Sequence, residues 1–183
     1  MSTVAVSKLV RASVGEIWRA FTDLPARGRY LSTVETVEVL TPGPFGTGTR
    51  WRETRSLPDG TRVTEEYVVN EVVPRVLCAI TSPGVGADYR ITYRFTPVDV
   101  GRRRGGTVVT VVQDGGPTAP YGRFLALMFG GLAARSVESA LRCDLADLAV
   151  AAQSLGADPT GRSAEPTGRP GGGTDKVVDG EAA

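Results

Sequence analysis

The apolar residues after Pro117 recur at steps of three and four, which is the spacing of one face of an α-helix. The pattern continues to about Ser154 and predicts a single helix of more than thirty residues. At roughly 1.5 Å per residue, such a helix exceeds about 45 Å. A helix of this length needs a large apolar surface to cover it, which the rest of the chain has to provide. The stripe consists of Phe124, Leu127, Met128, Gly131, Leu132, Val137, Leu141, Leu145 and Leu148.

Upstream segments with the composition of β-strands can supply that surface. Six of them are separated by Gly and Pro turn signals, and an extended run at residues 3–10 adds a seventh strand. After this first strand, Ser13 and Glu16 have the spacing of a capping box and predict a short helix. Pro25 ends that helix and can begin a second short one through about Leu31. The six later strands are predicted at about 34–41, 49–57, 61–73, 76–82, 87–98 and 106–114.

Composition excludes several classes of function. The 183 residues include no histidine, which rules out Ser-His-Asp and Cys-His mechanisms and zinc sites that need imidazole. Basic and acidic residues number 21 and 20, so the net charge of +1 gives no electrostatic argument for nucleic-acid binding. Cys78 and Cys143 form neither a disulfide framework nor a metal-binding spacing. We therefore expect no metal, no cofactor and no nucleic-acid partner.

The two ends of the chain differ from its centre. No run of about 18 or more apolar residues is present, so we expect no membrane span. The N-terminus lacks the pattern of a signal peptide, and a cytoplasmic location is the default expectation. Residues 156–183 are rich in Gly and Pro and contain no aromatic residue, so they bury too little apolar surface to offset their ordering entropy. We expect one folded domain at 1–155 and a disordered tail at 156–183.

A turn signal between the second and third of these six strands predicts which of their residues face each other. The sequence Leu57-Pro58-Asp59-Gly60 is typical of a type I turn closed by a glycine bulge. Counting back from this turn places Trp51 opposite Tyr67 and Glu53 opposite Glu65. The predicted inward face then carries Trp51, Val63, Tyr67 and Val69, while the pairs Arg52–Glu66 and Thr54–Thr64 lie on the outer face.

This register places three charged residues, Glu53, Arg55 and Glu65, on the inward face. A buried charge is costly unless it is paired. The cluster is therefore either an ion-pair network that shapes the sheet or the polar end of a ligand pocket, where it can act as an acid/base pair. Two carboxylates this close are also expected to raise the pKa of one of them. Alternation along the strand at 88–95 points Tyr89 and Tyr93 inward as well, as core or as pocket residues.

The order of elements and three local motifs resemble the START-like, helix-grip proteins, and within them the polyketide cyclase/dehydrase-type (SRPBCC) family. Residues 10–23, VRASVGEIWRAFTD, are similar to the opening motif of the family, with Ser13 where the family usually has proline. Residues 48–55 and 64–66 are similar to its central hairpin. The resemblance covers about residues 3–154. It implies an α+β helix-grip fold, in which a curved antiparallel seven-stranded sheet wraps around the C-terminal helix and encloses a hydrophobic cavity.

Members of this family bind lipids, sterols, polyketides or plant hormones, and some are cyclases or aromatases. We expect a small-molecule binding protein that holds an apolar or aromatic, lipid- or polyketide-like ligand. One alternative is a polyketide cyclase, aromatase or dehydratase that uses pocket Glu, Tyr and Arg side chains, with Glu53, Arg55 and Glu65 as catalytic candidates. Another is an interaction protein with a filled interior. The sequence assigns no oligomeric state. The candidate ligand-binding residues are Tyr30, Trp51, Glu53, Arg55, Glu65, Tyr67, Tyr89, Tyr93, Phe124 and Met128.

Overall fold

The computed structural model describes residues 2–56, 60, 62–84, 87–117 and 120–157, with the side chains of 2, 83, 84, 87, 116, 117 and 120–134 left out. The chain begins with a strand, continues with three short helical segments, and then forms six strands and one long helix. These are β1 (Ser2–Val10), α1 (Val14–Thr22), η1 (Leu24–Ala26), α2 (Arg27–Tyr30), β2 (Val34–Val39), β3 (Arg50–Ser56), β4 (Arg62–Val73), β5 (Leu77–Gly84), β6 (Ala87–Pro97), η2 (Gly101–Arg103), β7 (Thr107–Pro117) and α3 (Pro120–Ala157).

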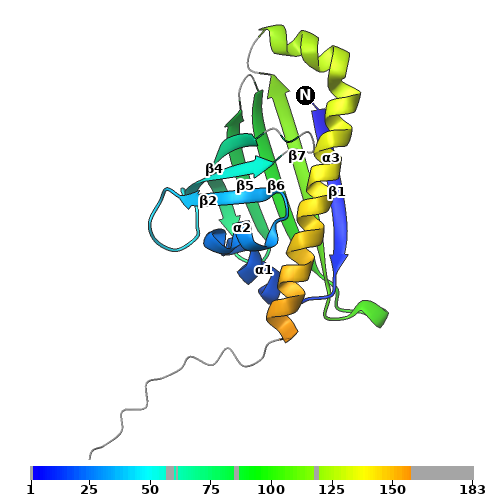
Figure 1. Ribbon diagram of the computed structural model, residues 1–183. Helices are drawn as coiled ribbons and strands as arrows, with labels where there is room; N and C mark the ends of the chain where they lie inside the picture. The colour runs from blue at the N-terminus through cyan, green and yellow to red at the C-terminus, as the bar shows by residue number, and fades with distance from the viewer. Residues whose placement is uncertain (1, 57–59, 61, 85–86, 118–119, 158–183) are drawn as a thin grey trace, which may run out of the picture.

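The seven strands form one antiparallel sheet in the order β1-β7-β6-β5-β4-β3-β2. The long helix α3 lies along one face of this sheet, and α1 and α2 lie near the C-terminal end of α3 (Figure 1). Helix α3 packs against β1 and α1. Its buried side chains Leu141, Leu145, Leu148 and Ala152 keep the three- and four-residue spacing of the predicted stripe. The predicted α+β helix-grip architecture is confirmed.

The register of β3 and β4 is the one that the turn signal predicts. Trp51 lies opposite Tyr67 and Glu53 opposite Glu65. On the outer face, the hydroxyls of Thr54 and Thr64 are 3.0 Å apart. The inward side chains of Trp51, Glu53, Tyr67 and Val69 are all buried. Turn residues 57–59 and 61 lie outside the described part of the chain.

Helix α1 begins at the predicted capping box. The Ser13 hydroxyl accepts a hydrogen bond from the Glu16 backbone N–H at 3.3 Å, and the Ser13 backbone N–H donates to Glu16 Oε2 at 2.7 Å. The helix packs on the sheet through Phe21, whose ring centroid lies 4.8 Å from that of Tyr93 and 5.4 Å from that of Phe95. These ring contacts hold α1 against β6.

Two further expectations concern Cys78 and the tail. Cys78 is fully buried in the core, and burial raises the pKa of its thiol to about 12, so it behaves as a small apolar residue.

Residues 158–183 lie outside the described part of the chain. The boundary between a domain at 1–155 and a disordered tail therefore stays a prediction, although α3 continues to Ala157.

Candidate functional site

A cavity of about 280 Å³ lies between the inner face of the sheet and α3. Strands β3 to β7 supply most of its wall, and α2 and the middle of α3 supply the rest. Its lining residues are Arg27, Trp51, Arg55, Glu65, Tyr67, Ile80, Ser82, Tyr89, Ile91, Tyr93, Gln113, Ser136, Val137, Ala140, Leu141 and Asp144.

Aromatic side chains form the apolar part of the wall. Trp51 and Tyr67 are directly opposite each other on β3 and β4, and their rings stack with centroids 5.2 Å apart and an interplanar angle of 20°. Tyr89 and Tyr93 come from β6, two residues on either side of Ile91, so all three point to the same face of the strand. These rings give the cavity large apolar surfaces with polar tips.

A buried carboxylate lies directly behind this wall. Glu53 is 0% exposed, and three side chains donate four hydrogen bonds to its two oxygens. Its Oε1 accepts hydrogen bonds from Arg27 Nε at 2.5 Å and from Trp51 Nε1 at 2.8 Å. Its Oε2 accepts from Arg55 Nη2 at 2.8 Å and from Arg55 Nε at 3.1 Å. Glu53 is therefore fully engaged within the protein.

Asp144 extends this network to the long helix. Arg55 Nη1 donates to both carboxylate oxygens of Asp144, at 2.9 and 3.1 Å. The Thr33 hydroxyl also donates to Asp144, at 3.3 Å. One arginine from β3 thus joins a carboxylate of its own strand to one on α3. We call Arg27, Glu53, Arg55 and Asp144 the ionic network.

The protonation of Glu53 corrects one sequence-based expectation. Two facing carboxylates are expected to raise a pKa, and burial does oppose ionisation of Glu53. Nevertheless Arg27 and Arg55, together with the Trp51 indole N–H, hold the pKa of Glu53 below its usual value. The expectation is wrong for Glu53 because it omits Arg27. Burial disfavours the charged form of both arginines too, but the carboxylates beside them raise their pKa values.

Glu65 lies opposite Glu53 on the next strand, but unlike Glu53 it faces the cavity. It lines the cavity, and its Oε2 accepts a hydrogen bond from the Tyr67 hydroxyl at 2.5 Å. Within the described part of the chain, no arginine or lysine forms an ion pair with it. Burial, with the nearby Glu65 and Glu53 carboxylates, raises the pKa of Tyr67 well above its usual value despite the nearby Arg55. The Tyr67 phenol therefore stays protonated at neutral pH and acts as a donor.

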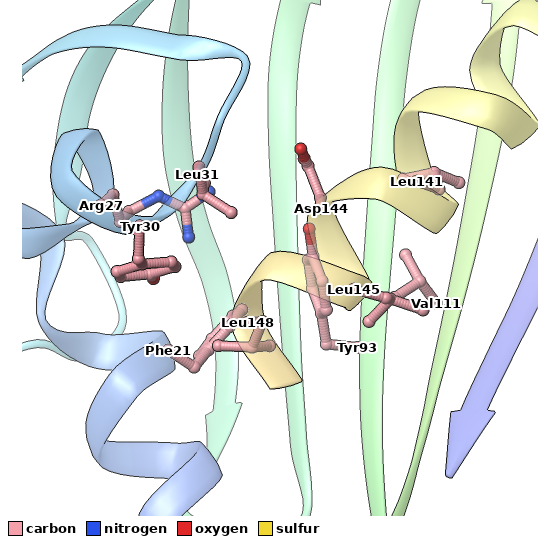
Figure 2. A pocket seen from close by; sticks show the side chains of 10 residues that line it. All are labelled: Phe21, Arg27, Tyr30, Leu31, Tyr93, Val111, Leu141, Asp144, Leu145 and Leu148. Carbon is pink, nitrogen blue, oxygen red and sulfur yellow. The ribbon is translucent and has the colours of Figure 1, made fainter. Parts of the chain in front are cut away.

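A second, much smaller space of about 10 Å³ lies beyond the cavity, toward α1. Figure 2 shows Phe21, Arg27 and Tyr30 on one side of it and residues of α3 on the other. Arg27, Tyr93, Leu141 and Asp144 line both spaces and so form the partition between them. The Tyr30 hydroxyl donates to the Ala20 carbonyl at 3.0 Å. This space holds no more than a water molecule.

The sequence-predicted site residues fall into three groups. Six of them line the cavity: Trp51, Arg55, Glu65, Tyr67, Tyr89 and Tyr93. Glu53 lies behind the cavity wall, and Tyr30 lies at the smaller space. Phe124 and Met128 belong to α3, but their side chains lie outside the described part of the structure. The role of each in binding stays a prediction.

Sequence reasoning missed Arg27, Ser82, Gln113 and Asp144. For Asp144 a signal existed, because it falls between Leu141 and Leu148 on the three- and four-residue steps of the buried helix face. For Gln113 the alternation along β7 with buried Val109 and Val111 was an available signal. Arg27 lies in a four-residue helix with no periodicity to mark it. Nothing in the sequence distinguishes Ser82 from other polar strand residues.

A seven-stranded antiparallel sheet that grips a C-terminal helix and encloses a cavity defines the START-like, helix-grip class. Residues 1–153 match the family model described as polyketide cyclase / dehydrase and lipid transport, and the chain belongs to this family. Within the described residues, no helix is long and apolar enough to cross a membrane.

Solved structures share the fold at low sequence identity. TTHA0849 from Thermus thermophilus has a TM-score of 0.68 and 21% identity, covering 84% of this chain and 98% of that one. A START superfamily protein from Mycobacterium smegmatis has a TM-score of 0.66 and 14% identity, with the same coverages. The di-domain ARO/CYC BexL from the BE-7585A biosynthetic pathway has a TM-score of 0.61 and 16% identity, covering 84% of this chain and 50% of that one. No curated protein matches the sequence.

Proposed function

We propose that this protein binds a small apolar or aromatic molecule in the cavity between the sheet and α3. The observation that carries the proposal is the cavity of about 280 Å³, walled by stacked aromatic rings and a few polar groups. This combination is typical of small-molecule sites, which are mostly apolar with a small number of placed polar groups. Membership in a family described by polyketide cyclisation, dehydration and lipid transport supports the same class of ligand.

The binding test uses an uncharged dye, N-phenylnaphthylamine, whose emission rises in an apolar site. The chain has two tryptophans, so a Trp18→Phe variant leaves Trp51, in the cavity wall, as the sole tryptophan. We expect saturable binding with a dissociation constant on the order of micromolar, because few fixed polar contacts limit the free energy per ligand atom. Native mass spectrometry of the protein purified from its own host then identifies the bound molecule.

Filling the cavity from α3 should weaken this binding. Ala140 lines the cavity and is exposed, so Ala140→Phe adds a ring at the opening without disturbing the core. We expect the dissociation constant for the dye to rise at least about tenfold, because the ring occupies volume that the dye needs. Ser139→Phe is the matched control, since Ser139 is exposed and does not line the cavity. Equal binding by both variants would place the dye elsewhere and remove the support for a carrier.

A second candidate function is favoured by the hydrogen bond between Tyr67 and Glu65 in the cavity wall. A carboxylate with no paired cation can accept a proton from the carbon beside a ligand carbonyl. In a β-hydroxyketone, Glu65 would take that proton and return it to the departing hydroxyl, so that water leaves and a C=C bond forms. The single O–H of Tyr67 would turn from Glu65 to the ligand and donate to the carbonyl oxygen as the enolate develops.

Dehydration of an aryl β-hydroxyketone separates the two candidates, because the conjugated product absorbs in the near ultraviolet. For a dehydratase, Glu65→Gln should lower the rate about a hundredfold or more, since general acid–base catalysis contributes about 10²–10⁴-fold. Dye binding by the same variant reports whether the cavity survives. The carrier is favoured if the wild type does not turn over this compound while the Glu65→Gln variant still binds the dye.

A further inference from the structure

Among the residues that the structure describes, the charged groups in and directly behind the cavity wall carry one more negative charge than positive. Arg27 and Arg55 are the cations at its wall. The anions are Glu65 and Asp144 in the wall and Glu53 directly behind it. A carboxylate ligand would therefore enter a site whose own charge repels it.

Both arginines already form ion pairs with carboxylates of the protein. Arg27 is buried and contacts Glu53 at 2.5 Å. Arg55 contacts Glu53 at 2.8 Å and Asp144 at 2.9 Å, on different guanidinium nitrogens. An anionic ligand would have to compete with these protein carboxylates for both guanidinium groups, and weakening a buried ion pair is strongly unfavourable.

A neutral polar group of the cavity does lack a partner. Ser82 is 2% exposed, it lines the cavity, and its hydroxyl is a buried polar atom without a hydrogen-bond partner among the described residues. It lies opposite Tyr89 on β6. A serine hydroxyl can donate to a carbonyl or accept from a hydroxyl, and leaving it unpaired in an apolar site costs free energy. A ligand with either group recovers that cost.

We propose that the cavity selects small uncharged aromatic molecules that carry a hydroxyl or carbonyl group, and that it rejects carboxylates of the same size. The Ser82 hydroxyl forms the specific hydrogen bond to the ligand, and the surplus charge of Glu65 provides the rejection. The volume of about 280 Å³ sets the size at one or two fused rings, because it lies near the lower end of ligand pockets, about 300–1,000 Å³. This inference rests on the proposed binding function and narrows its ligand class.

Three ligands of one shape test the proposal: naphthalene, β-naphthol and β-naphthoate, each titrated by calorimetry into the full chain at pH 7.5. We expect β-naphthol to bind at least about tenfold more tightly than β-naphthoate, because the carboxylate must be desolvated beside an unpaired anion. Glu65→Gln should narrow this ratio by strengthening β-naphthoate binding. Dye binding by Glu65→Gln confirms that the cavity is intact.

The hydrogen bond is tested separately by Ser82→Ala. This variant should weaken β-naphthol binding about three- to tenfold and leave naphthalene binding unchanged. Its unfolding midpoint should not fall, since the deleted hydroxyl has no partner among the described residues. Thr81→Ala is the matched control, because the adjacent strand residue points to the opposite face of the sheet.

The outcomes are distinct. Equal or tighter binding of β-naphthoate overturns the charge selection while the carrier function stands. An equal loss for naphthalene and β-naphthol in Ser82→Ala overturns the role of the hydroxyl. If the folded wild type binds neither the dye nor any of the three ligands, the proposed function itself fails. Preference for β-naphthol that depends on Ser82 supports the proposal.

Discussion

Replacing Glu53 by Gln should lower the free energy of unfolding by about 3–5 kcal/mol, the typical cost of removing one partner of a buried ion pair. Glu53 is 0% exposed and provides the counter-charge for Arg27, which is itself buried. Gln is nearly the same size and still accepts from the Trp51 indole, so the loss reports the charge and not the packing. Urea unfolding at neutral pH measures it.

An exposed ion pair is the control. Glu38 is paired with Arg52 at 3.0 Å, but their side chains are 64% and 43% exposed. Glu38→Gln should therefore change the free energy of unfolding by no more than about 1 kcal/mol. If Glu53→Gln costs as little as Glu38→Gln, the ionic network is not held together as a buried charged cluster in solution.

The stability difference between the wild type and Glu53→Gln should change with pH in a defined direction. The pKa of Glu53 is lower in the folded protein than in the unfolded chain, where it is about 4.3. Its contribution is fully present above the unfolded value and is lost as the pH falls through the folded value, because the unfolded state then binds more protons. The stability difference between wild type and Glu53→Gln should shrink on going from neutral pH to below about pH 4.

Replacing Phe21 by Ala should lower the free energy of unfolding by about 3–5 kcal/mol, because a large buried ring is lost and a cavity remains. Phe21 is 2% exposed. Its ring lies 4.8 Å from that of Tyr93 and 5.4 Å from that of Phe95, and it fixes α1 to the sheet. Thermal or urea unfolding measures the loss.

The matched control for Phe21 is an exposed apolar residue. Val39 on β2 is 41% exposed, so Val39→Ala should stay within about 0.5 kcal/mol. A small loss for Phe21→Ala would mean that α1 is not held to the sheet through this ring. The dye titration on Phe21→Ala also reports whether binding in the cavity depends on the packing of α1.

Several features of the fold follow from interactions between residues that are near each other in the sequence. A turn needs particular residues, a helix start needs a cap, and a buried helix face repeats at three and four residues. These rules act over a few residues, so they predicted the β3–β4 register, the start of α1 at Ser13 and the buried face of α3. They also predicted that Trp51, Glu53, Arg55 and Tyr67 share one face of the sheet.

Only the tertiary structure decided which charges meet on that face. Arg27 is 26 residues from Glu53 in the sequence, and Asp144 is 89 residues from Arg55. Their contacts depend on how α2 and α3 are rotated and shifted on the sheet, which the packing of the whole core sets and no local pattern encodes. For this reason the sequence left two roles open for Glu53, and the structure places it at the buried centre of the ionic network. Glu65 and Ser82 line the cavity outside that network.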